Sequence, residues 1–184
     1  DVNEAPAVSS DIADASTAED SAYSSDISGN FADVDSGTTL TYTATGMPST
    51  LTMSTAGTLS GTPLNANVGA HSIVVTASDG TLTVADTFVL TVINVNDAPT
   101  VSSAIADAST AEDSAYSTDI SGNFADVDAD DTLTYTATGM PSTLTMSTAG
   151  TLSGTPLNVN VGTHTIVVTA SDGTLTVADT FVLT

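Results

Sequence analysis

Apolar and polar residues alternate along three stretches in the first half of the chain. The clearest is residues 39–45, T-L-T-Y-T-A-T, and residues 71–77 and 87–92 repeat the pattern. The inward positions would be Leu40, Tyr42 and Ala44 in the first stretch, His71, Ile73, Val75 and Ala77 in the second, and Phe88, Leu90 and Val92 in the third. A period of two is typical of a β-strand with one buried face, so each stretch predicts such a strand.

Shorter strands are predicted at residues 22–27, 51–53 and 58–60. Turn signals separate the strands at Gly46-Met47-Pro48, Ala56-Gly57, Gly61-Thr62-Pro63, Asn67-Val68-Gly69 and Ser78-Asp79-Gly80. Helical patterns are nearly absent. About seven short strands per module, with turns every ten residues or so, are typical of a β-sandwich. The predicted fold class is therefore all-β, with antiparallel sandwiches built on small aliphatic cores.

The whole pattern occurs twice, because the chain matches itself without a gap at an offset of about 93 residues. Only about 11 of roughly 91 paired positions differ. Near-identical tandem modules favour an array of structural units over an enzyme. We expect one module at residues 1–93 and a second at residues 94–184, with the last strand of the second cut short at Thr184.

The charge balance is one-sided, with 22 acidic residues, no Lys or Arg, and a net charge of −22. Nucleic acids and anionic membrane surfaces need cationic partners, so binding to either is excluded. We expect no membrane insertion, because the chain contains no apolar run of transmembrane length. Without cysteine or lysine, disulfide and isopeptide staples are also excluded, which leaves a bound cation as a source of stability. The absence of a signal-peptide pattern indicates an internal piece of a longer chain, which we expect to be a monomer.

The acidic residues cluster at what should be the ends of each sandwich. No acidic residue lies between Tyr42 and Ser78, or between Tyr135 and Ser171. The run Asp126-Val127-Asp128-Ala129-Asp130-Asp131 offers alternating carboxylates, which suit hard cations such as Ca²⁺. The alternative is that Asp and Asn only mark turns and solvated loops. The recurrence of an acid pair, a D-x-D loop, a late Asp-Gly and an N-x-N-D linker in both modules favours the cation.

These residues carry a resemblance to a known family. The linker Asn94-Val95-Asn96-Asp97-Ala98-Pro99 is similar to the cadherin linker pattern D-x-N-D-x-x-P, with the proline displaced by one position. The runs Asp128–Tyr135, Gly139-Met140-Pro141, Ser153–Pro156, Val161–Gly173 and Asp179-Thr180-Phe181 resemble the bacterial dystroglycan-type cadherin-like repeat. The resemblance covers both modules and implies two tandem Ig/cadherin-like Greek-key sandwiches. Such repeats occur in large surface adhesins and in extracellular polysaccharide-degrading proteins.

The resemblance also implies calcium sites between modules. In cadherins, an early Glu of the upstream domain, the linker, a D-x-D loop and a late Asp of the downstream domain hold the ions. Carried over by position, the ligands at the joint are Glu19, Asn94, Asn96, Asp97, Asp126, Asp128 and Asp172. By the same mapping, Asn3, Glu4, Asp33, Asp35 and Asp79 would face a preceding module, and Glu112 a following one.

The chain departs from the cadherin pattern in two ways. Nothing between Gly46 and Ala77 corresponds to the mid-domain D-R-E of cadherins, which implies fewer ions per joint. In addition, module two has Ala129-Asp130-Asp131 where module one has Ser36-Gly37-Thr38. Asp130 and Asp131 are therefore further candidate ligands of the second module only. Asp86 and Asp179, just before the predicted last strand of each module, are weaker candidates.

Other residues that could carry chemistry have simpler structural interpretations. His71 and His164 occupy equivalent strand positions and are expected to be structural, as are Tyr42 and Tyr135 in the core. The pair Glu19-Asp20 could mimic a glycosidase pair, but adjacent residues on one strand would point to opposite faces. We therefore expect no enzymatic activity.

The leading hypothesis is a calcium-stiffened spacer of a secreted or cell-surface bacterial adhesin, with neighbouring repeats of the same chain as its partners. The alternative is a calcium-dependent module that binds carbohydrate or like repeats on another cell. The scarcity of aromatic residues, at 4%, counts against a sugar-binding platform.

Overall fold

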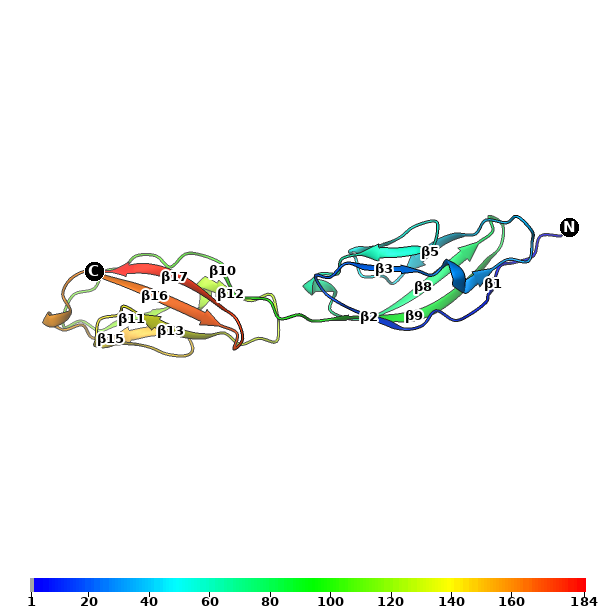
Figure 1. Ribbon diagram of the computed structural model, residues 1–184. Coiled ribbons are helices and arrows are strands. Elements are labelled where there is room, and N and C mark those ends of the chain that lie inside the picture. The colour runs from blue at the N-terminus through cyan, green and yellow to red at the C-terminus, as the bar shows by residue number, and fades with distance from the viewer. Residues whose placement is uncertain (1) are drawn as a thin grey trace. The chain divides into compact units, whose positions relative to one another are not determined.

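The computed structural model describes residues 2–184, and its regular secondary structure is almost wholly β-strand (Figure 1). The chain forms two compact units, of which unit 1 ends at Val95 and unit 2 runs from Asn96 to Thr184. The helical elements among the described residues are four 3-10 turns. Within residues 2–184, no helix has the length and apolar character needed to cross a membrane. The all-β prediction is confirmed.

The described part of unit 1, residues 2–95, contains nine strands in three sheets. The four-stranded sheet has the order β2-β9-β8-β5, the three-stranded sheet has the order β3-β7-β6, and β1 pairs with β4. The strands are β1 Ala7–Val8, β2 Ala15–Ala18, β3 Tyr23–Asp26, β4 Phe31–Ala32, β5 Thr41–Thr45, β6 Leu51–Met53, β7 Thr58–Gly61, β8 Gly69–Ser78 and β9 Thr83–Ile93. The 3-10 turns η1 Ser28–Asn30 and η2 Asn65–Asn67 lie between them.

The alternation seen in the sequence reappears as burial on the long hairpin of β8 and β9. These two strands pair from Gly69 opposite Val92 to Ser78 opposite Thr83. Ile73, Val75 and Ala77 are fully buried, whereas Ser72 and Val74 between them are exposed. One face of the four-stranded sheet is therefore apolar and packs on the core, because side chains alternate across a strand.

The core of unit 1 joins the inner faces of its two larger sheets. Leu59 from β7 and Leu90 from β9 are fully buried. The rings of Phe31 and Tyr42 pack at 5.7 Å with a tilt of 59°. The hydroxyl of Tyr42 donates to the carbonyl oxygen of Ser28 at 3.2 Å, which satisfies its one polar group. Tyr42 is thus a core residue, as expected from its place in the alternating pattern.

The pairing of β2 with β9 differs from the prediction. β2 runs parallel to β9, with Ala15 opposite Leu90 and Ala18 opposite Ile93, so the expectation of purely antiparallel sheets is wrong at this pair. The sequence Ala-Ser-Thr-Ala of β2 has too little apolar alternation to be recognised as a strand. The two-residue strands β1 and β4 were missed for the same reason, because they carry almost no pattern.

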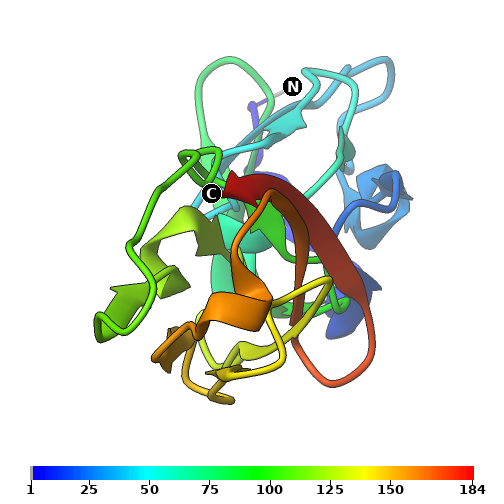
Figure 2. The ribbon, with the colours of Figure 1, turned by 90° about the vertical axis from the view of Figure 1, so that its left-hand side faces the viewer.

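Unit 2 repeats this arrangement with eight strands. Its sheets have the orders β13-β16-β17, β11-β15-β14 and β10-β12. In place of β2, a single parallel bridge joins Ala108 to Leu183. The η4 turn and the end of β17 lie at the same end of this unit (Figures 1 and 2). The elements are β10 Thr100–Val101, β11 Tyr116–Asp119, η3 Ser121–Asn123, β12 Phe124–Ala125, β13 Thr134–Thr138, β14 Leu144–Met146, β15 Thr151–Gly154, η4 Asn158–Asn160, β16 His164–Ser171 and β17 Thr176–Leu183.

Candidate metal centre

The D-x-D loop of unit 2 follows β12 directly and holds the first residues of the unit. Oδ1 of Asp126 accepts a hydrogen bond from the N–H of Asp128 at 3.0 Å, which closes a turn of the kind that Asp favours. Oδ2 of Asp128 accepts from the N–H of Asp97 at 2.7 Å. Asp128 is only 5% exposed. The loop therefore brings Asp97, Asp126 and Asp128 together at one end of unit 2.

A second contact fastens the linker to the turn between β16 and β17. Nδ2 of Asn96 donates to Oδ2 of Asp172 at 2.9 Å. Oδ1 of Asp172 accepts from the N–H groups of Leu175 and Thr174, at 2.6 and 2.5 Å. These backbone hydrogen bonds, that of Leu175 first, hold the pKa of Asp172 below its ordinary value. One carboxylate oxygen of Asp172 thus accepts hydrogen bonds within the turn, and the other accepts one from the linker residue Asn96.

Asp131 adds a third carboxylate to the D-x-D loop. Its N–H donates to the carbonyl oxygen of Asp128 at 3.1 Å. Asp126, Asp128 and Asp131 can each offer a carboxylate oxygen, and these oxygens lie within 4.8 Å of one another. Loss of water and then the negative charges of Asp128 and Asp126 raise the pKa of Asp131. This crowding is unfavourable in the ionised state, and a bound cation would relieve it.

Two carboxylate oxygens in the D-x-D loops are left without a partner. Oδ2 of Asp126 in unit 2 and Oδ2 of Asp33 in unit 1 are both buried and make no hydrogen bond within the described residues. Folded proteins seldom leave a buried polar atom unsatisfied. The side chains of these loops offer carboxylate oxygens, which are the ligands that Ca²⁺ and Mg²⁺ prefer. The loops therefore fit a hard divalent cation.

Unit 1 repeats these contacts at its own N-terminal end. The N–H of Glu4 donates to Oδ2 of Asp35 (2.8 Å), Nδ2 of Asn3 to Oδ2 of Asp79 (2.9 Å), and the N–H of Asp35 to Oδ1 of Asp33 (2.8 Å). At the position of Asp131, unit 1 has Thr38, whose N–H donates to the carbonyl oxygen of Asp35 at 3.2 Å. The turn is conserved between the units, but the third carboxylate belongs to unit 2 alone.

Glu19 lies in the turn that follows β2, at the C-terminal end of unit 1. Its N–H donates to the carbonyl oxygen of Ile93 at 3.0 Å, and its Oε1 accepts from the N–H of Val95 at 3.0 Å. The side chain is 1% exposed, and Oε2 is buried without a hydrogen-bond partner within residues 2–184. Burying a carboxylate without compensation costs roughly several kcal/mol. Glu19 is therefore the strongest indication of a cation at this end of unit 1.

The pair Glu19-Asp20 is not on a strand, so the prediction that the two side chains point to opposite faces of one strand is wrong. β2 ends at Ala18, and Asp20 has a φ of 56°, in the left-handed region. The N–H of Asp20 donates to the carbonyl oxygen of Pro63 at 2.8 Å. Asp tolerates this conformation better than most residues, so the turn forms without glycine.

Six of the predicted ligand residues are exposed: Asn3, Glu4 and Asn96, which make the hydrogen bonds described above, and Asn94, Glu112 and Asp130. Asn94 directly follows the end of β9. Asp130 lies beside Asp131 and contributes to its raised pKa through charge. Glu112 is the repeat counterpart of Glu19, and the counterpart of Val95 would fall beyond Thr184. The structure thus separates Asn94, Glu112 and Asp130 from the buried carboxylates.

Asp86 and Asp179 stabilise the fold of their units and do not belong to the acidic clusters at the ends of the units. Oδ2 of Asp86 accepts from the N–H of Ile12 at 2.7 Å, and Asp179 does the same for Ile105 at 2.7 Å. Asp14 and Asp107, which the sequence pattern did not indicate, make the reciprocal contacts by accepting hydrogen bonds from the last strand of each unit. Oδ1 of Asp14 accepts from Val89 and Oδ1 of Asp107 from Val182, each at 2.7 Å. In the sequence, the clue to this role was that these four Asp residues lie away from the predicted turns.

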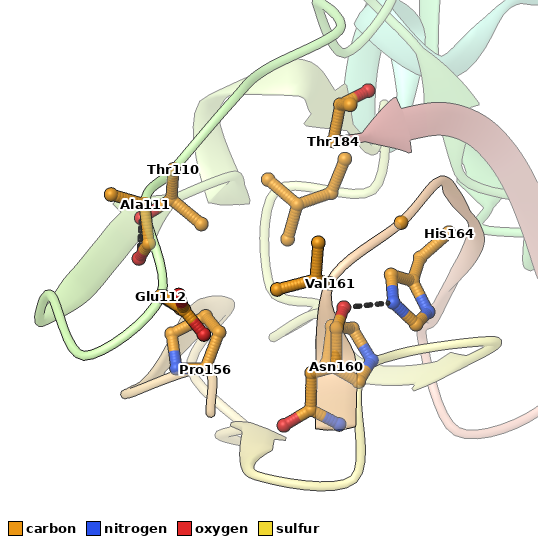
Figure 3. A pocket seen from close by; sticks show the side chains of 11 residues that line it. Thr110, Ala111, Glu112, Pro156, Asn160, Val161, His164 and Thr184 are labelled. Atoms are coloured by element: carbon orange, nitrogen blue, oxygen red, sulfur yellow. Dashed lines mark hydrogen bonds between the residues drawn. The ribbon is translucent and has the colours of Figure 1, made fainter. Parts of the chain in front are cut away.

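The two histidines have a structural role, as expected. Nε2 of His71 lies 2.7 Å from the carbonyl oxygen of Asn67, and Nε2 of His164 lies 2.8 Å from that of Asn160 (Figure 3). Each histidine is half-buried on its strand and ties that strand to the 3-10 turn before it.

Unit 2 contains a cavity at each end. One, of about 500 Å³, includes the carboxylates of Asp126, Asp128 and Asp131 beside Phe124 and Tyr135. The other, of about 370 Å³, lies around Val161 and Leu183 (Figure 3). The first belongs to the candidate metal centre, and the second is separate from it.

One family profile matches both units. The family described as "Putative Ig domain" matches residues 5–93 and again residues 98–184. A search of curated proteins found no match.

Several solved structures are similar to the chain. The endo-fucoidan hydrolase MfFcnA4 of glycoside hydrolase family 107 is 28% identical, over 97% of this chain, with a TM-score of 0.47. The chain spans 28% of the length of that hydrolase. Mouse cadherin-23 EC22-24 is 16% identical, over 94% of this chain and 61% of the cadherin, with a TM-score of 0.65. Human protocadherin-24 EC1-2 is 14% identical, over 84% of this chain and 86% of the other, with a TM-score of 0.51. At this identity the cadherin likeness concerns the fold, and it confirms the Ig/cadherin-like sandwich.

Proposed function

The chain belongs to the "Putative Ig domain" family, and we propose that its two units are calcium-binding spacer modules of a larger secreted or cell-surface bacterial adhesin. In this proposal the chain catalyses no reaction. Its work is mechanical, because bound calcium converts a flexible joint between modules into a stiff one. Its partners are the neighbouring repeats of the same protein.

The observation that carries the proposal is the burial of Glu19. One of its oxygens is satisfied by the N–H of Val95, and the other is buried without a hydrogen-bond partner among the described residues. No Lys or Arg exists in the chain to neutralise it. A hard cation is the partner that best matches a buried carboxylate oxygen in so acidic a chain.

Chain connectivity supports a cation near the linker. Glu19 holds Val95 at the end of unit 1, and Asp128 holds Asp97 at the start of unit 2. Val95 and Asp97 are two residues apart, so their Cα atoms are at most about 7.6 Å from each other. A cation bound to the linker could therefore draw on carboxylates that both units fasten to it. The carbonyl oxygens of the linker itself would add ligands.

Calcium suits this arrangement better than magnesium. Ca²⁺ accepts six to eight oxygen ligands in flexible geometry, whereas Mg²⁺ demands a near-ideal octahedron. Extracellular calcium modules typically have Kd values of about 10⁻⁴–10⁻³ M. Sites of that strength fill in extracellular fluid and stay empty in the cytosol, which agrees with the proposed location.

Calcium titration of the full chain by calorimetry tests the proposal. Glu19→Gln keeps the size of the side chain and removes its charge, and we expect it to weaken calcium binding at the joint at least about tenfold. Glu112→Gln is the matched control, since it makes the same change at the exposed counterpart and should leave binding unaltered. Equal calcium binding by the wild type and Glu19→Gln would overturn the proposal.

A second candidate, calcium-dependent carbohydrate binding, has one observation in its favour. The cavity of about 500 Å³ beside Asp126, Asp128 and Asp131 could place a sugar hydroxyl against a bound cation. Glycan binding that requires calcium and is lost in Asp131→Thr would support this candidate over the spacer.

A further inference from the structure

A further cavity of unit 2, of about 360 Å³, lies between β11 and residues 104–108, and we call it the β11 groove. Ile105, Ile120 and Phe181 are buried and provide its apolar inner wall. Its lining residues differ from those of the candidate metal centre and of the cavity around Val161. A cavity of this volume, with apolar walls and a few polar groups, is typical of a binding site for a side chain or small molecule.

Tyr116 supplies an aromatic ring to the β11 groove. The side chain is half-buried, and loss of water raises the pKa of its hydroxyl. This hydroxyl makes no hydrogen bond within residues 2–184, whereas those of Tyr42 and Tyr135 each donate to a carbonyl oxygen. Tyr116 therefore lacks the polar contact that fixes the two core tyrosines, and its hydroxyl remains available to a ligand.

Two carboxylates line the same groove. Oδ1 of Asp107 accepts from the N–H of Val182 at 2.7 Å, and Oδ1 of Asp119 accepts from the N–H of Ser121 at 2.9 Å. Hydrogen bonds from the backbone and then the hydroxyl of Ser121 hold the pKa of Asp119 below its ordinary value, so Asp119 is anionic at neutral pH. The chain has no Lys or Arg that could pair with either carboxylate.

The polar groups of the β11 groove are mostly hydrogen-bond acceptors. Nδ2 of Asn123, the one N–H donor among the lining side chains, donates to the carbonyl oxygens of Ser103 and Ala104 at 3.0 and 3.2 Å. The hydroxyls of Tyr116 and Thr118 can either donate or accept. A ligand that fits must therefore supply donors, and a positively charged donor gains the most beside carboxylates.

We propose that the β11 groove binds an arginine side chain of a basic partner polypeptide. A guanidinium group is planar, so it can stack on the ring of Tyr116 while it donates to the carboxylates of Asp107 and Asp119. The aliphatic part of the arginine would lie against the apolar wall. Lysine suits this lining less well, because its ammonium group is a compact charge without a planar face.

Charge and topology both favour a polypeptide partner. The net charge of −22 attracts a basic chain and repels an acidic one. β11 lies at the edge of its sheet, with β15 as its partner strand, and an extended segment can lie along such an edge. The arginine would then enter the groove beside β11.

Unit 1 repeats four of the lining residues at the matching positions, as Asp14, Tyr23, Asp26 and Asn30. Two of their contacts recur as well, because the N–H of Val89 donates to Asp14 at 2.7 Å and that of Ser28 to Asp26 at 3.0 Å. Each repeat would then offer one site. A partner with several arginines would bind such an array more tightly than a single arginine binds one groove.

Fluorine NMR of the full chain labelled with 3-fluorotyrosine tests the proposal, because the chain has only four tyrosines. The probes are the peptide acetyl-Gly-Ser-Arg-Ser-Gly-amide and the same peptide with citrulline, an uncharged isostere, in place of arginine. Chelator makes the outcome independent of calcium binding, and salt at about 0.15 M screens diffuse attraction. We expect the arginine peptide to shift the Tyr116 signal saturably, and the citrulline peptide to bind at least about tenfold more weakly.

A pair of matched variants assigns the effect to the groove. Asp119→Asn removes the charge and keeps an oxygen that can accept from the N–H of Ser121, and it should weaken binding at Tyr116 roughly three- to tenfold. Asp130→Asn makes the same change at an exposed position outside the groove and should leave binding unaltered. Equal binding of the two peptides, or equal losses in the two variants, would overturn the proposal. A shift of all four tyrosine signals together would do so too, because the arginine would then follow the general negative charge.

Discussion

The N–H of Val95 donates a hydrogen bond of 3.0 Å to Oε1 of Glu19, a residue 76 positions earlier in the chain. This bond joins the end of unit 1 to the turn that follows β2. It also fixes the carboxylate with one oxygen used and the other buried. The other oxygen, Oε2, is the one that the proposed cation would bind.

Asp131 should affect stability in opposite directions with and without calcium. Its pKa is raised above the ordinary 3.8, so the folded chain holds this proton more tightly than the unfolded chain does. Ionised Asp131 therefore destabilises the folded state at neutral pH, and the penalty fades as the pH falls through the raised pKa toward 3.8. Asp131→Thr should raise the melting temperature of the calcium-free chain at about pH 7 and leave it unchanged at about pH 3.

In saturating calcium, the same variant should melt at a lower temperature than the wild type, because a ligand is lost. Thr38→Asp, the reciprocal change in unit 1, should lower the melting temperature of the calcium-free chain at about pH 7 and raise it in saturating calcium. A gain from Asp131→Thr of the same size at both pH values would contradict the assignment of the effect to the carboxylate.

Asp86→Ala should destabilise unit 1 by roughly 1–3 kcal/mol, because the N–H of Ile12 would lose its acceptor in a partly buried place. Chemical denaturation followed by circular dichroism measures the change. Asp11→Ala is the control, since Asp11 is exposed and unit 2 has Ala104 at the matching position. A similar loss in both variants would mean that general charge, not the hydrogen bond, is responsible.

Leu59→Ala should cost about 2–5 kcal/mol of unfolding free energy, because the side chain is fully buried between the sheets. Leu64→Ala removes the same atoms from a residue that is 51% exposed, and should change stability by no more than about 0.5 kcal/mol. Urea denaturation of both variants checks the difference. Comparable losses would show that the core lies elsewhere than the structure places it.

Calcium should narrow the distribution of distances between the two units. The chain has no native cysteine, so Thr52→Cys and Thr145→Cys, both at exposed strand positions, allow one spin label on each unit. Pulsed electron resonance should show a broad distribution in chelator and a narrow one in calcium. Glu19→Gln should abolish the narrowing, and a distribution indifferent to calcium in the wild type would argue against a stiffened joint.

The strands with strong alternation could be predicted from the sequence almost residue by residue. Residues 51–53 form β6 as predicted, and residues 71–77 lie within β8. β2 could not be predicted, because its four residues are held by parallel pairing with β9, about 75 positions away, and not by a local pattern. Long-range pairing leaves little trace in short, weakly apolar segments.

The candidate site was predictable in its residue types and less so in its geometry. The linker and the D-x-D loop come together as the pattern indicated, through Asp97 and Asp128. The sequence could not separate Asp131 from Asp130, because the difference arises from a turn that brings Asp131 back toward Asp128. Nor could it reveal the left-handed conformation of Asp20, since Asp adopts that conformation only where surrounding contacts impose it.

The parallel pairing of β2 with β9 has a consequence for how unit 1 resists stretching. Tension applied through the two ends of the unit would pull these neighbouring strands in opposite directions along their length. The pairs from Ala15–Leu90 to Ala18–Ile93 would then be loaded together in shear, and would have to break at once rather than unzip one by one.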